Sequence, residues 1–129
     1  MSLELSKAAL YTIYETSPKT VQITAALQEN NAPKLHLSGL LGSAMSFVIR
    51  SVFKKAELPF LVVLSNKEEA AYYLNDLEQM IGEEDVLFYP GSFRRPYQIE
   101  EVDNANVLLR AEVLNRINSR KKPAVIVSY

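Results

Sequence analysis

Short apolar runs alternate with helical patterns along most of this 129-residue chain. Four of these runs are typical of strands, and they lie at residues 34–38, 60–65, 86–89 and 124–128. Three of them are rich in β-branched residues, as the buried strands of a parallel sheet tend to be. Strands that alternate with helices are joined by right-handed crossovers. The sequence therefore predicts an α/β fold with a parallel sheet and helices on both of its faces.

Helical patterns fill the intervals between the expected strands, at residues 43–55, 66–81 and 103–119. The second of these begins with two overlapping capping pairs, Ser65 with Glu68 and Asn66 with Glu69, and we expect it to end at Gly82. The third pattern has an aliphatic stripe that we expect to face the core. Its members are Val107, Ala111, Leu114 and Ile117.

Two further helical patterns, at residues 5–14 and 20–30, precede the first expected strand. We therefore expect two parts, an N-terminal helical segment over residues 1–33 and an α/β domain over residues 34–129. The sequence stops directly after a strand pattern with no closing helix. A domain of this kind usually continues, so we expect the chain to be a fragment of a longer protein.

The composition is that of an ordinary globular chain, with 48% hydrophobic and 22% charged residues. Its 14 basic and 15 acidic residues nearly balance, so the charge does not indicate a polyanionic partner. The absence of cysteine excludes disulfides and cysteine-ligated zinc. The single histidine, His36, is expected to be partly buried in the first strand. Because there is no cysteine and only one histidine, we expect no metal site. No membrane span or signal peptide is evident, and we expect a cytoplasmic protein.

Residues 39–46 match the outline of a phosphate-binding loop, whose full pattern is G-x-x-x-x-G-K-[ST] between a strand and a helix. Two of the residues that bind phosphate are replaced. Ala44 stands in place of the second glycine, and Met45 stands in place of the lysine that carries charge to the phosphates. We call this segment the degenerate phosphate loop. Its candidate site residues are Gly39, Gly42, Ser43, Ala44, Met45 and Ser46.

Three interpretations of this loop remain open. It can be a simple turn in which glycines allow the bend and Ser43 and Ser46 act as capping groups. It can be a phosphate loop that has lost its chemistry. It can also bind nucleotide with a substitute cation, for which Arg50, Arg94 and Arg95 are the candidates. Hydrolysis is not expected, because no strand pattern ends in the acidic residue that magnesium needs.

Residues 88–97 interleave aromatic side chains with paired arginines after the third expected strand. Ligands of parallel sheets bind at this end of the strands. The segment can be an ordered loop that covers the sheet edge, an interface with another domain, or a site for single-stranded nucleic acid. The side chains that would make the last two contacts are Arg94, Arg95 and Tyr97.

The order of several sequence blocks resembles the N-terminal, UvrB-like domain of the bacterial transcription-repair coupling factor (Mfd) family. The resemblance covers the chain from about Leu35 to Tyr129, and its blocks begin with the degenerate loop. They lie at residues 39–44, 61–63, 86–90, 110–115 and 124–128.

This resemblance implies a partial P-loop NTPase or helicase-like domain that is not itself an enzyme and holds no cofactor. The full-length proteins of the family displace stalled RNA polymerase with an ATP- and Mg-dependent DNA translocase domain. They then recruit the nucleotide excision repair machinery through UvrA, which mainly contacts the domain that follows. Ala44 and Met45 are consistent with lost nucleotide binding. Residues 91–102 are too few for the long hairpin with which UvrB probes damaged DNA, so we do not expect this segment to sense damage directly. The resemblance instead implies a scaffold that contacts neighbouring domains.

Overall fold

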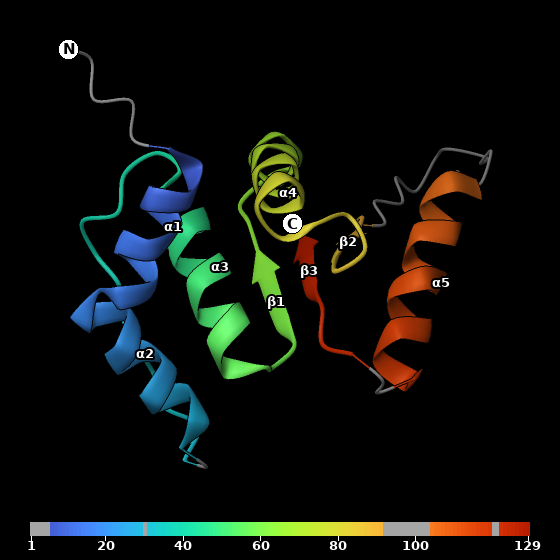
Figure 1. Ribbon diagram of the computed structural model, residues 1–129. Coiled ribbons are helices and arrows are strands. Elements are labelled where there is room, and N and C mark those ends of the chain that lie inside the picture. Colours follow the sequence, from blue (N-terminus) through green and yellow to red (C-terminus); the bar gives the residue numbers. More distant parts are fainter. Residues whose placement is uncertain (1–5, 30, 92–103, 120–121) are drawn as a thin grey trace. The chain divides into compact units, whose positions relative to one another are not determined.

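The computed structural model describes residues 6–29, 31–91, 104–119 and 122–129 of the chain (Figure 1). The chain divides into two compact units, Met1–Glu57 and Leu58–Tyr129. The sequence led us to expect a boundary between residues 33 and 34, and that organisation into domains stays a prediction.

The first unit is helical in its described part. It contains α1 (Lys7–Thr16), α2 (Pro18–Gln28) and α3 (Ala44–Ala56), and α3 contacts both of the other helices. The Ser6 side chain begins α1 by accepting a hydrogen bond from the Ala9 N–H at 3.2 Å. The side of α3 that packs inward carries Val48, Ser51 and Val52, which recur at helical spacing and are all buried.

The strand predicted at residues 34–38 is absent, and this prediction was wrong. Residues 34–39 have no regular secondary structure and are all exposed, including Leu35, Leu37 and His36. The expected partly buried histidine is therefore an exposed one. A strand persists only where a neighbour accepts its backbone hydrogen bonds, and the described part of this unit offers only helices. Alternating Leu-His-Leu residues alone do not supply that neighbour.

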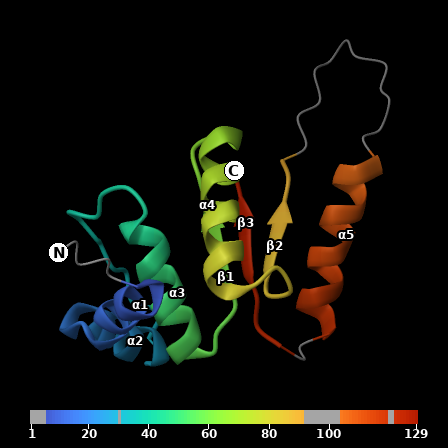
Figure 2. The same ribbon diagram turned by 45° about the horizontal axis from the view of Figure 1, so that its top comes forward.

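The second unit contains a three-stranded parallel sheet in the order β1-β3-β2 (Figure 2). The strands are β1 (Phe60–Val63), β2 (Val86–Tyr89) and β3 (Val125–Ser128), and the helices between them are α4 (Lys67–Ile81) and α5 (Asn104–Ser119). The predicted α/β class with a parallel sheet is confirmed. The sheet has three strands rather than four because the first predicted strand does not form.

The strand register determines which side chains share a face of the sheet. Ile126 pairs with Leu61 on one side and Leu87 on the other, so these three residues lie on one face. Val113 of α5 packs there with Leu87 and Ile126. Val125 and Val127 point to the opposite face, where they are fully buried, and α4 contacts β2 and β3. We infer that α4 covers that face, so the two helices lie on opposite sides, as the sequence predicted.

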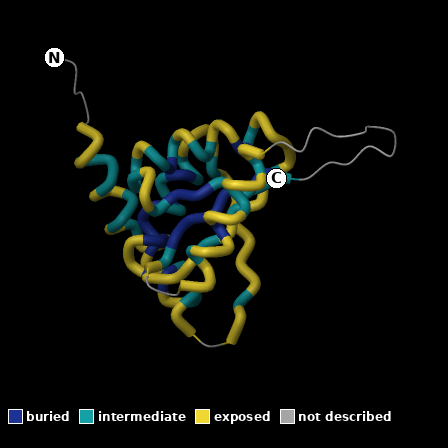
Figure 3. The backbone as a smooth tube through the Cα atoms, turned by 90° about the vertical axis from the view of Figure 1, so that its right-hand side faces the viewer, coloured by how far each residue is buried: buried dark blue, intermediate teal, exposed yellow. Residues whose placement is uncertain are grey.

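The direction of the two crossovers explains this arrangement. The chain passes from β1 across the sheet to β2 through α4, and returns from β2 to the central β3 through α5. Right-handed crossovers in opposite directions place their helices on opposite faces. Figure 3 colours buried residues dark blue, and the buried residues of the sheet include Val86 and Leu87 of β2 and Val125, Ile126 and Val127 of β3.

Local signals define the start and the end of α4, and of the two predicted capping pairs the structure forms Asn66 with Glu69, while Ser65 pairs with Glu69 rather than Glu68. The Glu69 N–H donates to the Asn66 side-chain oxygen at 2.8 Å, and the Glu69 carboxylate accepts from the Ser65 N–H at 3.1 Å. Gly82 ends the helix with φ at 115°, in the region that favours glycine. Ala70 and Leu77, which are seven residues apart and therefore lie on one side of the helix, are fully buried.

The buried side of α5 differs from the prediction. Val113 is buried, whereas the aliphatic stripe is exposed: Val107 by 50%, and Leu114 and Ile117 by 52% each. Two arginines explain the difference. Arg110 lies over the Tyr89 ring at 5.1 Å, and Arg116 donates hydrogen bonds to groups at the amino end of the sheet. These contacts turn the side of α5 that carries Val113 and the arginines towards the sheet, and the aliphatic stripe away from it.

Asp85 is the centre of an ionic cluster that precedes β2. Its two carboxylate oxygens lie 2.7 Å from Arg116 Nη2 and 2.9 Å from Lys122 Nζ. The neighbouring Glu83 and Glu84 are exposed, whereas Asp85 is half-buried. Burial disfavours the charge of Asp85, but hydrogen bonds from Lys122 and Arg116, and their charges, outweigh it and lower its pKa below the ordinary 3.8.

We expect the replacement Asp85→Asn to lower the free energy of unfolding by roughly 1 kcal/mol at pH 7. Because the folded-state pKa is lowered, the stabilisation is fully present above the unfolded-state pKa and is lost as the pH falls through the folded-state value. Urea unfolding of both proteins between pH 2 and 7 should show the difference shrinking below pH 3.8. The control is Glu84→Gln in the same turn. A difference that does not depend on pH would contradict the ionic cluster.

Candidate functional site

The degenerate phosphate loop keeps the backbone conformation that its glycines predict. Gly39 and Gly42 have φ angles of 80° and 55°, in the left-handed region that favours glycine. A Cβ atom at either position would meet no atom within 4 Å, so the glycines are required by conformation rather than by close packing. Leu41, Gly42 and Ser43 are exposed, and Leu41 is 84% exposed. The loop is therefore an exposed turn before α3.

The groups that would bind phosphate in an intact loop are otherwise engaged. The Ala44 N–H donates to the Leu41 carbonyl at 3.1 Å. This hydrogen bond closes the turn and engages one of the backbone amides that would face a phosphate in an intact loop. Ser46 is only 1% exposed, so its hydroxyl is not accessible to a metal ion in solution. Ser43 occupies the N-cap position of α3, and its side chain makes no capping hydrogen bond. Met45, in the lysine position, is half-buried.

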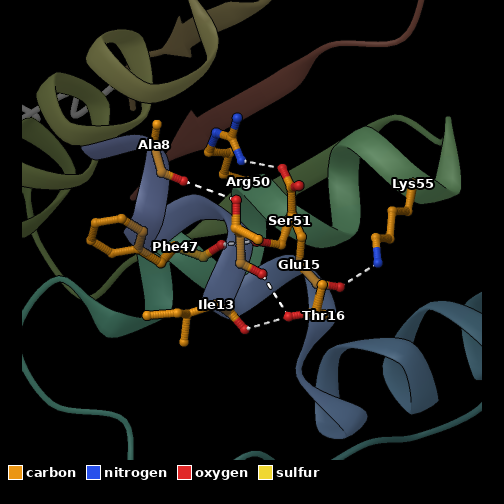
Figure 4. Close-up of polar contacts among 9 residues, drawn as sticks. Ala8, Ile13, Glu15, Thr16, Phe47, Arg50, Ser51 and Lys55 are labelled. Atoms are coloured by element: carbon orange, nitrogen blue, oxygen red, sulfur yellow. Dashed lines mark hydrogen bonds and ion pairs between the residues drawn. The ribbon is translucent and has the colours of Figure 1, made fainter. Parts of the chain in front are cut away.

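Arg50, the substitute cation proposed on α3, is held by α1 (Figure 4). Its Nη1 lies 2.6 Å from the Glu15 carboxylate, and its Cζ lies 3.6 Å from the centre of the Tyr11 ring. The Arg50 side chain is 10% exposed. A guanidinium that is paired, stacked and nearly buried would have to give up both contacts to meet a phosphate. The charge nearest the loop on α3 is thus part of the helical packing.

Further contacts between α1 and α3 support this ion pair. The Tyr14 ring stacks on Phe47 at 4.9 Å between centroids, and Tyr11 lies 5.8 Å from the same ring. Lys55 Nζ donates to the Glu15 carbonyl (Figure 4). Glu15 therefore contacts α3 twice, through its side chain at Arg50 and through its backbone carbonyl at Lys55.

Of the segment at residues 88–97, in which we expected contact sites, the structure describes residues 88–91. Arg94, Arg95 and Tyr97 lie outside the described residues, so their proposed roles stay predictions. The beginning of the segment is described. Ser128 Oγ donates to the Tyr89 carbonyl at 2.8 Å, and the Phe88 and Tyr129 rings stack at 6.1 Å.

These contacts give the carboxyl ends of β2 and β3 an aromatic surface, to which Arg110 adds its stacking on Tyr89. Phe88 and Tyr89 belong to β2 itself, so the interpretation that the later aromatics of the segment cover the sheet edge stays a prediction. The acidic residue that magnesium would need is missing there, because β1, β2 and β3 are followed by Leu64, Pro90 and Tyr129.

Across residues 6–29, 31–91, 104–119 and 122–129, no three His, Asp or Glu side chains come together in a way that could hold a metal ion. In the same described ranges, no helix combines the length and the apolar character needed to cross a bilayer.

Comparison with known proteins gives no relatives: no family model, no curated protein and no solved structure matches the chain.

The cluster of Arg50, Glu15 and Tyr11 was not predicted from the sequence. Arg50 was proposed as a phosphate-binding cation because it lies one turn beyond the loop. Its true partner is 35 residues away in sequence, and nothing in the local pattern identifies it. The one available signal was a carboxylate and two tyrosines on the same face of the first helix, at positions 15, 11 and 14.

Removal of the Glu15 charge should destabilise the first unit, because it leaves the nearly buried Arg50 without its counter-ion. We expect Glu15→Gln to lower the free energy of unfolding by about 1–3 kcal/mol, discounted from a fully buried pair because the Glu15 side chain is 33% exposed. Urea unfolding monitored by circular dichroism measures the change. Glu29→Gln, at the end of α2, is the control. Equal stability of the Glu15 variant and the wild type would contradict the structural role of the pair.

Proposed function

We propose that this chain is a non-catalytic scaffold and interaction domain. The sequence blocks resemble the first part of the UvrB-like module of a bacterial transcription-repair coupling factor, and we propose that the chain plays the corresponding role. The chain itself would bind no nucleotide and no metal. It would act in the cytoplasm as part of a larger protein.

The commitment of Arg50 to Glu15 and Tyr11 is the observation that carries this proposal. A phosphate site needs positive charge or several free amide donors close to the ligand. In this loop the lysine position holds Met45, and the arginine one turn further along is paired and stacked. Phosphate would therefore meet a weak site, made of the start of one helix without a side-chain cation.

Two other features support a loop without nucleotide chemistry. The Ala44 N–H closes a turn on Leu41, and the Ser46 hydroxyl is buried. Residues 34–38 form no strand, so the strand–loop–helix context that confirms a phosphate loop is missing before Gly39.

The proposed role within the larger protein follows from the resemblance alone. The domain would hold neighbouring domains of the same polypeptide in place. ATP and magnesium would act in the translocase domain of that protein, which would displace stalled RNA polymerase from DNA. The contact with UvrA, and hence recruitment of nucleotide excision repair, would belong mainly to the next domain.

The alternative of a nucleotide-binding loop with a substitute cation loses its nearest candidate, because Arg50 is engaged. Binding of single-stranded nucleic acid through Arg94, Arg95 and Tyr97 is a separate proposal without a described contact to favour it.

Calorimetric titration of the 129-residue chain with ATP and magnesium tests the proposal. We expect no saturable heat at ATP concentrations up to about 1 mM, which corresponds to binding weaker than about 4 kcal/mol. The physical reason is the missing cation. Binding by the wild type with a micromolar dissociation constant would overturn the proposal.

Two variants make the titration informative when the wild type gives no saturable heat. The double variant Ala44→Gly and Met45→Lys restores both missing residues of the loop pattern. The matched control, Ala44→Gly with Met45→Leu, restores the glycine without the charge. Weak binding by the first variant alone would show that the lost side chains, rather than the backbone, removed the nucleotide site.

A further inference from the structure

One face of the second unit exposes aliphatic side chains from two different elements. Leu61 and Val63 of β1 are 66% and 67% exposed, and Val107, Leu114 and Ile117 of α5 are 50–52% exposed. We call these five residues the aliphatic face. Single exposed aliphatic residues are common on protein surfaces; this group differs because its members come from a strand and a helix on the same side of one sheet.

The register of the sheet places the two β1 residues on the side that α5 covers. Leu61 and Leu87 both pair with Ile126, and Val63 and Tyr89 both pair with Ser128. Leu87 and Ile126 are packed against Val113 of α5. The helix that covers this side of the sheet contacts β2, and it leaves the β1 side chains in solvent.

The uncovered part of this sheet face has the width of one helix. β1 lies two strand spacings from β2, which is about 10 Å, and a packed helix has a diameter of about 10 Å. Each copy of the chain therefore carries an open strip over β1 and, beside it, a helix with an exposed aliphatic stripe. A two-fold rotation lets each copy offer its helix to the strip of the other, which is the self-complementarity of an isologous interface.

Nothing in the sequence of β1 opposes such a contact. Residues 58–64 read Leu-Pro-Phe-Leu-Val-Val-Leu and contain no charge. Exposed strands at sheet edges are commonly protected by charged side chains, and β1 is an edge strand that lacks them. Ala111, in the middle of the α5 stripe, is exposed and small enough to allow close approach of a second backbone.

We propose that a second copy of this chain covers the aliphatic face in a weak, two-fold symmetric dimer. Full burial of an aliphatic side chain removes roughly 60–120 Å² from water, so the five partly exposed ones offer on the order of 250 Å² of apolar surface per copy. A standard interface buries about 800 Å² per partner, of which somewhat more than half is apolar. The face thus supplies about half of that apolar area, which fits the small, weak class of interface.

This dimer does not depend on the proposed scaffold function, because it would stand equally if the loop bound ATP. The two proposals also have separate tests.

Sedimentation equilibrium of the 129-residue chain between about 2 and 400 µM tests the dimer, a range chosen for a weak interface. We expect the mass to rise from 14.5 kDa towards twice that value, equally at low and high salt because the contact is apolar. Leu61→Lys and Leu114→Lys should each weaken the association at least tenfold. The control Tyr72→Lys, on a 75% exposed position of α4, should leave it unchanged. Circular dichroism verifies that each variant is folded.

The absence of cysteine from the chain allows a second, geometric test. Ala111→Cys should form a disulfide-linked dimer on mild oxidation, because the two α5 helices approach each other. Ala71→Cys, an exposed alanine on α4, is the matched control and should remain monomeric. A monomer over the whole concentration range would overturn the proposal. So would a dimer that both lysine variants leave intact, or one that Ala71→Cys traps as readily as Ala111→Cys.

Discussion

The central position of β3 is the constraint on which the second unit depends. This strand comes last in the sequence, yet both β1 and β2 pair with it, and its Val125 and Val127 are fully buried. Until β3 arrives, neither of the other strands has a partner in the sheet. The crossovers to and from β2 then place α4 and α5 on opposite faces, which leaves one side of β1 uncovered. The fold and its exposed aliphatic face therefore have the same origin.

In the first unit, the corresponding constraint is the ion pair between Arg50 and Glu15. It joins α1 to the helix that follows the degenerate loop, and the stacking of Tyr14 on Phe47 reinforces the same contact. An arginine that serves packing in this way does not serve phosphate binding. Met45 in the position of the loop lysine and the use of Arg50 in the helical core thus favour the same interpretation, a turn that does not bind phosphate.

Features set by neighbouring residues could be predicted from the sequence, and features set by distant contacts could not. The cap at Asn66 and the stop at Gly82 depend on residues within one turn, and both are confirmed. The prediction of a strand at residues 34–38 was wrong because a strand depends on a partner strand. The buried side of α5 was wrong because Arg110 and Arg116 bind groups of the sheet that no periodicity reveals. The partner of Arg50, which is 35 residues away in sequence, could not be predicted for the same reason.

The central claim is that the degenerate loop binds no nucleotide, and amide resonances of the ¹⁵N-labelled chain test it residue by residue. ATP and magnesium are titrated while the amide signals of Gly39, Gly42, Ser43 and Ala44 are followed. We predict that these four signals keep their positions throughout, because no side-chain cation holds the phosphates near them. Saturable shifts of these amides at micromolar ATP would contradict the account.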